Sequence, residues 1–270
     1  MEALYDTAER VSASNSGNNK VKDLKEEMKG EAEALLLHQF PARILQLEQL
    51  LQSPEFNIRP AECHAEINVP RPLPITSVDN NGESEEGTSE SRPNENGEPE
   101  SARVCFIQTG EVAGTKILAL PGGTVGLNQR IVKLYDVVKP LISQLINDCN
   151  LLKMWIQFLI PKVEDGNNFG VGIQEDCLSE VRTVEVEAAA SLDQISRYHT
   201  ARGRMVSKIA KYPHIEDFRK AVDELDEKTL ITIRLTITEL RNNYSTLHDI
   251  ITKNLDKIKL PRTSNAQNLY

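Results

Sequence analysis

The stretch Pro161-Lys162-Val163-Glu164-Asp165-Gly166-Asn167-Asn168-Phe169-Gly170-Val171 is a short polar break between two long segments that carry apolar residues at helical spacing. Its two glycines can adopt φ > 0, and asparagine tolerates that conformation, so the break predicts a shaped turn. Phe169 adds an aromatic ring, which solvent-exposed loops usually avoid. We therefore expect a helical hairpin whose tip has a role of its own.

Helical periodicity extends far on both sides of this break. Before it, apolar residues recur at three- and four-residue steps over Leu127–Leu159, where Pro140 predicts a kink rather than an end. After it, one pattern covers Ile173–Tyr212, and a second covers Asp217–Leu260 and is closed by Pro261. Helices two to four are thus predicted within residues 125–260, followed by a tail over residues 261–270.

The N-terminal part adds one more predicted helix. Residues 1–19 are polar and are predicted to be flexible, whereas residues 20–53 carry a helical pattern in which Pro41 implies a break or kink. Three of the four segments span roughly 50 to 65 Å at the helical rise. The chain is therefore predicted to be all-α, a single elongated antiparallel four-helix bundle over residues 20–270.

An acidic segment separates the first helix from the others. Three prolines at alternate positions, Pro70, Pro72 and Pro74, favour extended backbone. Thr76–Glu100 then holds eight acids against one base, which accounts for −7 of the net charge of −9. Such a composition cannot bury enough apolar surface to order itself, so residues 70–115 are predicted to form a disordered loop. Short β-prone runs within residues 103–120 suggest an extended arm.

Charge and cysteine usage exclude several classes of protein. The acidic balance disfavours nonspecific nucleic-acid binding. The four cysteines, Cys63, Cys105, Cys149 and Cys177, are far apart and match no zinc or CxxC spacing, which indicates reduced intracellular thiols. Neither a signal peptide nor a membrane-spanning run is predicted. The five histidines form no ligand set, so neither a metal nor another cofactor is expected.

The last long segment is apolar on more than one face. Its crowded residues are Leu230, Ile231, Ile233, Leu235 and Ile237. A buried central helix in a monomer would explain them, but side-by-side oligomerisation fits better, because a bundle offers one interior seam per helix.

Catalytic motifs are absent from the sequence. No Gly-Lys dipeptide exists, which excludes a P-loop, and GxGxxG is missing. Glu164 and Asp165 could be taken as an acid/base pair, but adjacent carboxylates on a turn are far more often solvated. Without a family likeness, two functions remain open: a helical scaffold, which leaves the hairpin tip without a role, and an unrecognised hydrolase, which the missing motifs oppose.

The residues around the break resemble the 11S (REG) proteasome activator family. Ile160–Val171 resembles the activation loop of that family, and the likeness extends to the runs at Leu151–Gln157, Ser207–Asp217, Leu240–Tyr244, Leu247–Ile251 and Pro261–Ala266. It covers Leu127–Tyr270 closely and Lys20–Pro74 more loosely. The runs Asp193–Tyr198 and Gly114–Lys116 are most similar to the gamma type.

The resemblance implies a fold, a partner and site residues. Members assemble into a heptameric ring with a central channel, dock on the α-ring of the proteasome core particle without ATP, and open its gate to peptide and protein substrates. By this likeness Asn268, Leu269 and Tyr270 anchor the ring. The loop residues Lys162 to Gly170 open the gate, with Asn167 the first to mutate.

Three departures from the family pattern accompany this expectation. Lys162 stands where arginine is common, which keeps the charge but loses the planar fork. Arg204 stands where the gamma type has a pore-facing lysine that restricts which peptidase activity is raised; because a base persists, trypsin-like activity is expected to be favoured. The acidic loop stands where the gamma type has a basic nuclear-import cluster, so nuclear residence is expected from kinship alone and cytoplasmic residence is left open.

Overall fold

The fold is an elongated bundle of long helices, described by a computed structural model for residues 2–72, 123–163 and 168–262, with side chains from Gly17 onward. Its elements are α1 (Glu2–Ala34), η1 (Leu35–Gln39), α2 (Phe40–Gln52), η2 (Pro60–Cys63), α3 (Gln129–Leu159), α4 (Phe169–Lys211), α5 (Glu216–Lys253) and α6 (Leu255–Lys259). Within these ranges every element is helical, so the predicted all-α class is confirmed. The acidic segment Thr76–Glu100 and the β-prone runs lie outside the described residues.

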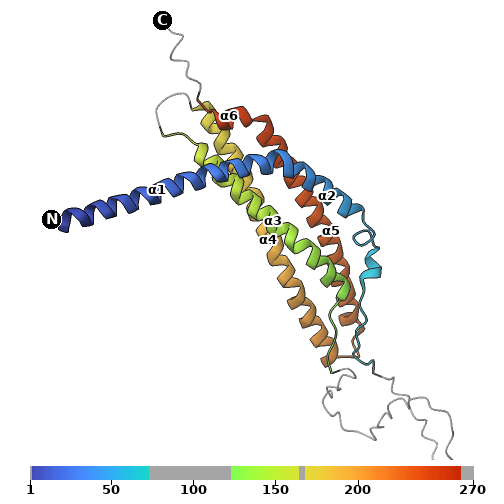
Figure 1. Cartoon of the computed structure of the whole chain (residues 1–270). Coiled ribbons are helices and arrows are strands. Elements are labelled where there is room, and N and C mark those ends of the chain that lie inside the picture. The colour runs from blue at the N-terminus through green and yellow to red at the C-terminus, as the bar shows by residue number, and fades with distance from the viewer. Residues whose placement is uncertain (1, 73–122, 164–167, 263–270) are drawn as a thin grey trace, which may run out of the picture.

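The three longest packed helices form the body of the molecule. Helices α3, α4 and α5 run alongside one another, and α2 lies along α5 (Figure 1). They bury one continuous apolar cluster whose fully buried members include Trp155, Phe40, Phe56, Leu36, Ile131, Ile142, Leu145, Leu152 and Ile156. Pro140 lies inside α3 without ending it. The last pattern, expected to be continuous to Leu260, is interrupted at Asn254 between α5 and α6.

Helix α1 begins at Glu2, so the predicted helix start near Lys20 is wrong. The described side chains from Gly17 to Glu27 are exposed, and α1 projects away from the bundle (Figure 1). Once the packed turns near Ala32 exist, each further residue adds a backbone hydrogen bond without a new nucleation cost, which explains an extension that periodicity does not reveal. The predicted flexibility of residues 1–19 stays a prediction.

Pro41 changes the helical path as its chemistry requires. Because proline has no N–H, the carbonyl of Leu37 loses its usual partner. The preceding turn, Leu35–Gln39, widens to a π-helix in which the Phe40 N–H donates to the Leu35 carbonyl. Leu35 and Leu36 are buried there, and α1 and α2 differ in direction (Figure 1). The π-helical turn thus joins α1 to α2 without a break and redirects the helix so that α2 packs on the bundle.

A buried carboxylate ties α3, α4 and α5 together at one end of the bundle. Asp226 is fully buried and accepts hydrogen bonds from Tyr198 Oη at 2.9 Å, Arg202 Nε at 3.3 Å and Asn128 Nδ2 at 2.7 Å. Burial, together with the Asp226 charge, raises the pKa of Tyr198, so its hydroxyl stays a donor. Asn128 also caps α3 by accepting from the Ile131 N–H at 3.3 Å. One carboxylate therefore fixes the register of three helices.

A second buried carboxylate joins α2 to α3 and α5 near the middle of the bundle. Tyr244 Oη donates to Asp148 Oδ2 at 2.6 Å, and Arg43 forms an ion pair with the same carboxylate. Phe40 packs edge-on against the Tyr244 ring, with centroids 4.8 Å apart. Because Asp148 and Tyr244 are buried, their contacts with Arg43 constrain where α2 can lie along α5.

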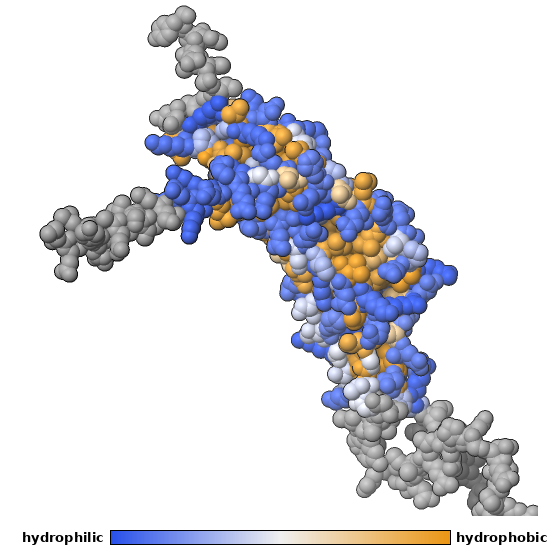
Figure 2. Space-filling view, viewed as in Figure 1, coloured by the Kyte–Doolittle hydropathy of each residue, from blue (hydrophilic) through white to orange (hydrophobic). Residues whose placement is uncertain are grey.

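The crowded apolar residues of α5 divide between two faces. Leu230, Ile233 and Ile237 are buried in the bundle, whereas Ile231 is 47% and Leu235 is 62% exposed. Figure 2 shows apolar residues interspersed with polar ones along the visible face of the bundle. The monomer therefore accounts for one apolar stripe of α5 and leaves a second in solvent.

We expect Asp226→Ala to lower the free energy of unfolding by about 3 to 5 kcal/mol, because it leaves the buried Arg202 charge unpaired. Glu224→Ala is the matched control, since Glu224 is exposed and its ion partner among the described residues is Lys220 on the same helix, at 2.9 Å. That control should change stability by less than about 0.5 kcal/mol. Urea denaturation followed by circular dichroism measures both, and equal effects would contradict the role given to Asp226.

The thiols give a second prediction. Cys63, Cys149 and Cys177 are buried, and burial raises the pKa of Cys63 to about 11 and that of Cys149 to about 12. At neutral pH these groups should stay protonated and react slowly with a thiol reagent such as dithionitrobenzoate. We expect at most one rapid thiol, that of Cys105, in the native protein and four in denaturant. Two or more rapid native thiols would contradict the described packing.

Candidate functional site

The hairpin between α3 and α4 leaves its described residues in solvent. Helix α3 ends at Leu159, where the Ile160 N–H still donates to the Ile156 carbonyl at 3.1 Å, and α4 begins at Phe169. Val163 is 93% and Phe169 is 76% exposed, and Lys162 and Asn168 are exposed too. Apolar side chains so open to water favour contact with a partner. The predicted loop residues Glu164, Asp165, Gly166 and Asn167 lie outside the described residues.

Gly170 is buried, and close approach of the chain explains its lack of a side chain. A Cβ on Gly170 would lie 2.0 Å from the Pro261 carbonyl oxygen and 2.6 Å from the Pro261 Cα. Among the described glycines, positive φ occurs at Gly123 and not at Gly170. Gly170 does not use its freedom to adopt φ > 0, and close contact with the backbone of the C-terminal segment explains the glycine instead.

The C-terminal segment thus reaches the same end of the bundle as the hairpin. Helix α6 lies beside the start of α4 (Figure 1), and Arg262 Nη2 donates to Asn168 Oδ1 at 3.2 Å. Lys259 pairs with Glu33 of α1 at 2.8 Å. Residues 263–270, which include the predicted anchors Asn268, Leu269 and Tyr270, lie outside the described residues. The loop stems and the root of the tail are in direct contact.

Gln174 joins these elements, and sequence reasoning missed it. Its side chain is fully buried, and Nε2 donates to the Leu159 carbonyl at 3.0 Å and to the Ile258 carbonyl at 2.7 Å. The last carbonyls of a helix lack intrahelical donors, so one amide group satisfies the ends of both α3 and α6. The available signal was an amide at a buried position of the helical stripe that continues with Cys177, Leu178 and Val181.

Arg204 lies on α4 far from this end. It is exposed, and it is separated from Gly170 by about 50 Å of helix at the usual rise per residue. The neighbouring Arg202 is buried against Asp226. The structure therefore does not bring the predicted specificity residue together with the loop.

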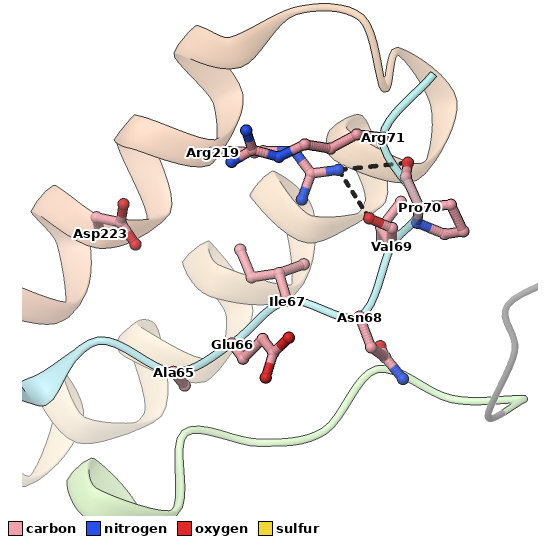
Figure 3. A pocket seen from close by; sticks show the side chains of 9 residues that line it. All are labelled: Ala65, Glu66, Ile67, Asn68, Val69, Pro70, Arg71, Arg219 and Asp223. Atoms are coloured by element: carbon pink, nitrogen blue, oxygen red, sulfur yellow. Dashed lines mark hydrogen bonds between the residues drawn. The ribbon is translucent and has the colours of Figure 1, made fainter. Parts of the chain in front are cut away.

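A cavity of about 500 Å³ opens where residues 65–71 cross α5 (Figure 3). Arg219 is mostly buried there, and its Nη2 donates to the Val69 carbonyl at 2.8 Å and to the Pro70 carbonyl at 3.5 Å. Arg71 lies 3.7 Å from Glu216. These contacts hold residues 65–71 onto α5. The cavity is the space left where this extended segment crosses the helix, and it needs no ligand to explain it.

The described residues meet the requirements of neither a metal site nor a membrane-spanning helix. Among them, no three His, Cys, Asp or Glu side chains gather closely enough to hold a metal ion. None of the helices in the same ranges is long and apolar enough to cross a membrane.

Comparison with known proteins gives a consistent result along the chain. The family model described as "Proteasome activator PA28, C-terminal" matches residues 124–268, and "Proteasome activator PA28, N-terminal" matches residues 15–74. The human "Proteasome activator complex subunit 3" is 47% identical over 252 residues, which are 93% of this chain and 95% of the relative. The chicken protein of that name is 48% identical with the same coverage.

A solved structure also matches. The 11S subunit of the Plasmodium falciparum proteasome, PA28, is 29% identical with a TM-score of 0.65, and the match covers 92% of this chain and 95% of that one. The predicted resemblance to the 11S activators and to their gamma type is thereby confirmed. The chain belongs to the proteasome activator PA28 family.

Proposed function

We propose that this protein is an ATP-independent activator of the proteasome core particle, acting as a heptameric ring rather than as an enzyme. In this role Asn268, Leu269 and Tyr270 dock on the core's α-ring, and the loop Lys162–Gly170 opens its gate to peptide and protein substrates. The observation that carries the proposal is that the loop stems and the tail root meet at one end of a long bundle. A docked tail would therefore bring the loop to the same surface.

Repetition around a ring supplies the affinity that one tail lacks. A three-residue anchor buries little surface and binds weakly by itself. Anchors on one rigid ring bind together, because each bound tail raises the effective concentration of the next. Gate opening further requires that the loop bind the open state better than the closed state, which a loop mounted on two packed helices can do.

The second apolar stripe of α5 supports assembly. Ile231 and Leu235 are exposed one helical turn apart, beside Leu51 of α2 and Arg234. A neighbouring subunit that covers them would remove apolar surface from water. On the family likeness, Arg204 is proposed to face the channel, and nuclear residence is proposed from the gamma-type relatives, with cytoplasmic residence left open.

We expect Asn167→Tyr to abolish stimulation while leaving docking intact, because the substitution alters the loop and leaves the sequence of the tail unchanged. Hydrolysis of fluorogenic peptides by purified core particle measures stimulation, and co-sedimentation with the core measures docking. Asn19→Tyr, at an exposed position of the projecting α1, is the matched control and should stimulate like the wild type. A protein that fails to stimulate the core in its wild-type form would refute the proposal and favour a helical scaffold.

Deletion of Asn268–Tyr270 should raise the activator concentration for half-maximal stimulation by about tenfold or more, since the weakening is repeated at every docked subunit. The number of subunits in the assembly, measured from its native mass, should stay unchanged, because the deletion leaves the described helices intact. Titration of core particle with each protein gives the comparison. An unchanged half-maximal concentration would exclude the tail as the anchor.

Arg204→Glu should raise the other peptidase activities relative to the trypsin-like one, because it reverses the charge proposed to line the channel. Lys211→Glu, also exposed and near the same end of α4, is the control for the change in net charge. Three peptides, one for each activity of the core, report the ratios. Equal shifts in both variants would argue against a specific role for Arg204.

A further inference from the structure

One side chain bridges the hairpin and the root of the tail. Gln174 donates both of its amide hydrogens, one to Leu159 at the end of α3 and one to Ile258 in α6, and it does so from within α4. The acceptors are separated from it by 15 and 84 residues. Because both hydrogens of this buried amide are hydrogen-bonded, Gln174 fixes the distances between the ends of α3, α4 and α6. Moving any of these ends would leave a buried carbonyl without a donor.

The backbone reinforces this junction. Pro261 leaves no room for a side chain at Gly170, and Arg262 bonds to Asn168 at the exit of the loop. The loop therefore leaves α3 just after a carbonyl held by Gln174 and enters α4 one turn before Gln174 itself. The tail departs just after the other carbonyl that Gln174 holds. Each of the two partner-facing segments thus starts within a few residues of the same amide.

Gln174 would be unfavourable if its only role were to fill space in the core. Its Oε1 is buried without a hydrogen-bond partner among the described residues, which costs the desolvation of an acceptor. A leucine or methionine would fill similar space without that penalty. What only an amide supplies is two hydrogen-bond donors on one uncharged nitrogen. The residue thus serves the placement of the helix ends more than the burial of apolar surface.

We propose that Gln174 is a positioning residue for gate opening: it fixes the loop stems relative to the tail root, so that anchoring of the tail sets where the loop presses. This inference rests on the proposed function. Gln174 should therefore affect how strongly the bound activator stimulates the core and not how tightly it docks. The tail can bind the core's α-ring whether or not the loop is correctly placed.

Gln174→Met tests the inference, since it keeps the length and volume of the side chain and removes both donors. We expect the maximal stimulation of peptide hydrolysis to fall about tenfold, as two buried hydrogen bonds no longer favour the aligned arrangement. The half-maximal activator concentration should stay within about twofold of the wild type. Gln174→Asn keeps the amide but shortens its reach, so an intermediate fall is expected, and it carries the test if the methionine variant does not assemble.

Tyr198→Phe is the matched control. It also removes one buried hydrogen bond from α4, but at the Asp226 cluster, about 36 Å further along the helix at the usual rise. Its maximal stimulation and half-maximal concentration should equal those of the wild type. An equal fall in this control would overturn the inference, because general destabilisation would then explain both variants. Wild-type stimulation by Gln174→Met, or a changed half-maximal concentration alone, would overturn it as well.

Hydrogen exchange separates this inference from the proposed function. In the isolated ring, Gln174→Met should speed exchange about fivefold or more for the hydrogen-bonded amides of residues 172–176 and 258–260, while amides around Asp226 exchange as in the wild type. Unchanged exchange would refute the junction even if the wild type activates the core. Faster exchange together with a wild-type protein that never stimulates the core would support the junction and refute the proposed function.

Discussion

Backbone groups at helix ends must find partners, and this constraint shapes both ends of the bundle. The final carbonyls of a helix have no donor within it, so a buried helix end needs one from elsewhere. At the hairpin end Gln174 supplies that donor to α3 and α6 together. At the opposite end Asn128 caps α3 and donates to the Asp226 carboxylate of α5. The apolar seam between these points makes the helices adhere, and the polar groups decide how far each one extends.

Polar clusters also resolve an ambiguity that apolar packing leaves. Long helices with similar aliphatic stripes can slide past one another by a turn at small cost, because leucine and isoleucine fit many neighbours. Asp226 and Asp148 remove that freedom, since a shifted register would leave a buried charge unpaired. The bundle therefore keeps one helix register along its length, and the loop stems and the root of the tail lie together at one end of it.

Exposure is distributed according to the same logic. Phe169 and Val163 at the hairpin, and Ile231 and Leu235 along α5, are apolar and open to water, although the bundle has a well-filled interior. Exposed apolar groups reduce solubility unless something covers them, so their placement at the tip and along one flank corresponds to two kinds of contact. The tip is suited to a partner, and the flank is suited to a neighbouring subunit.

The sequence by itself determined the all-α class, the placement of the hairpin between two long helices, and the family, because periodicity and the loop motif are local features. It placed the bend at Pro41, since a missing N–H acts within one turn. It could not find the start of α1 at Glu2, because the residues before Lys20 carry no apolar stripe and so leave no periodic signal. Nor could the sequence reveal the packing roles of Gly170 and Gln174. Pro261 lies 91 residues after Gly170 along the chain, and only tertiary packing brings the two into contact. The tertiary structure alone decided that loop and tail share one junction, because that depends on where helix ends meet in space.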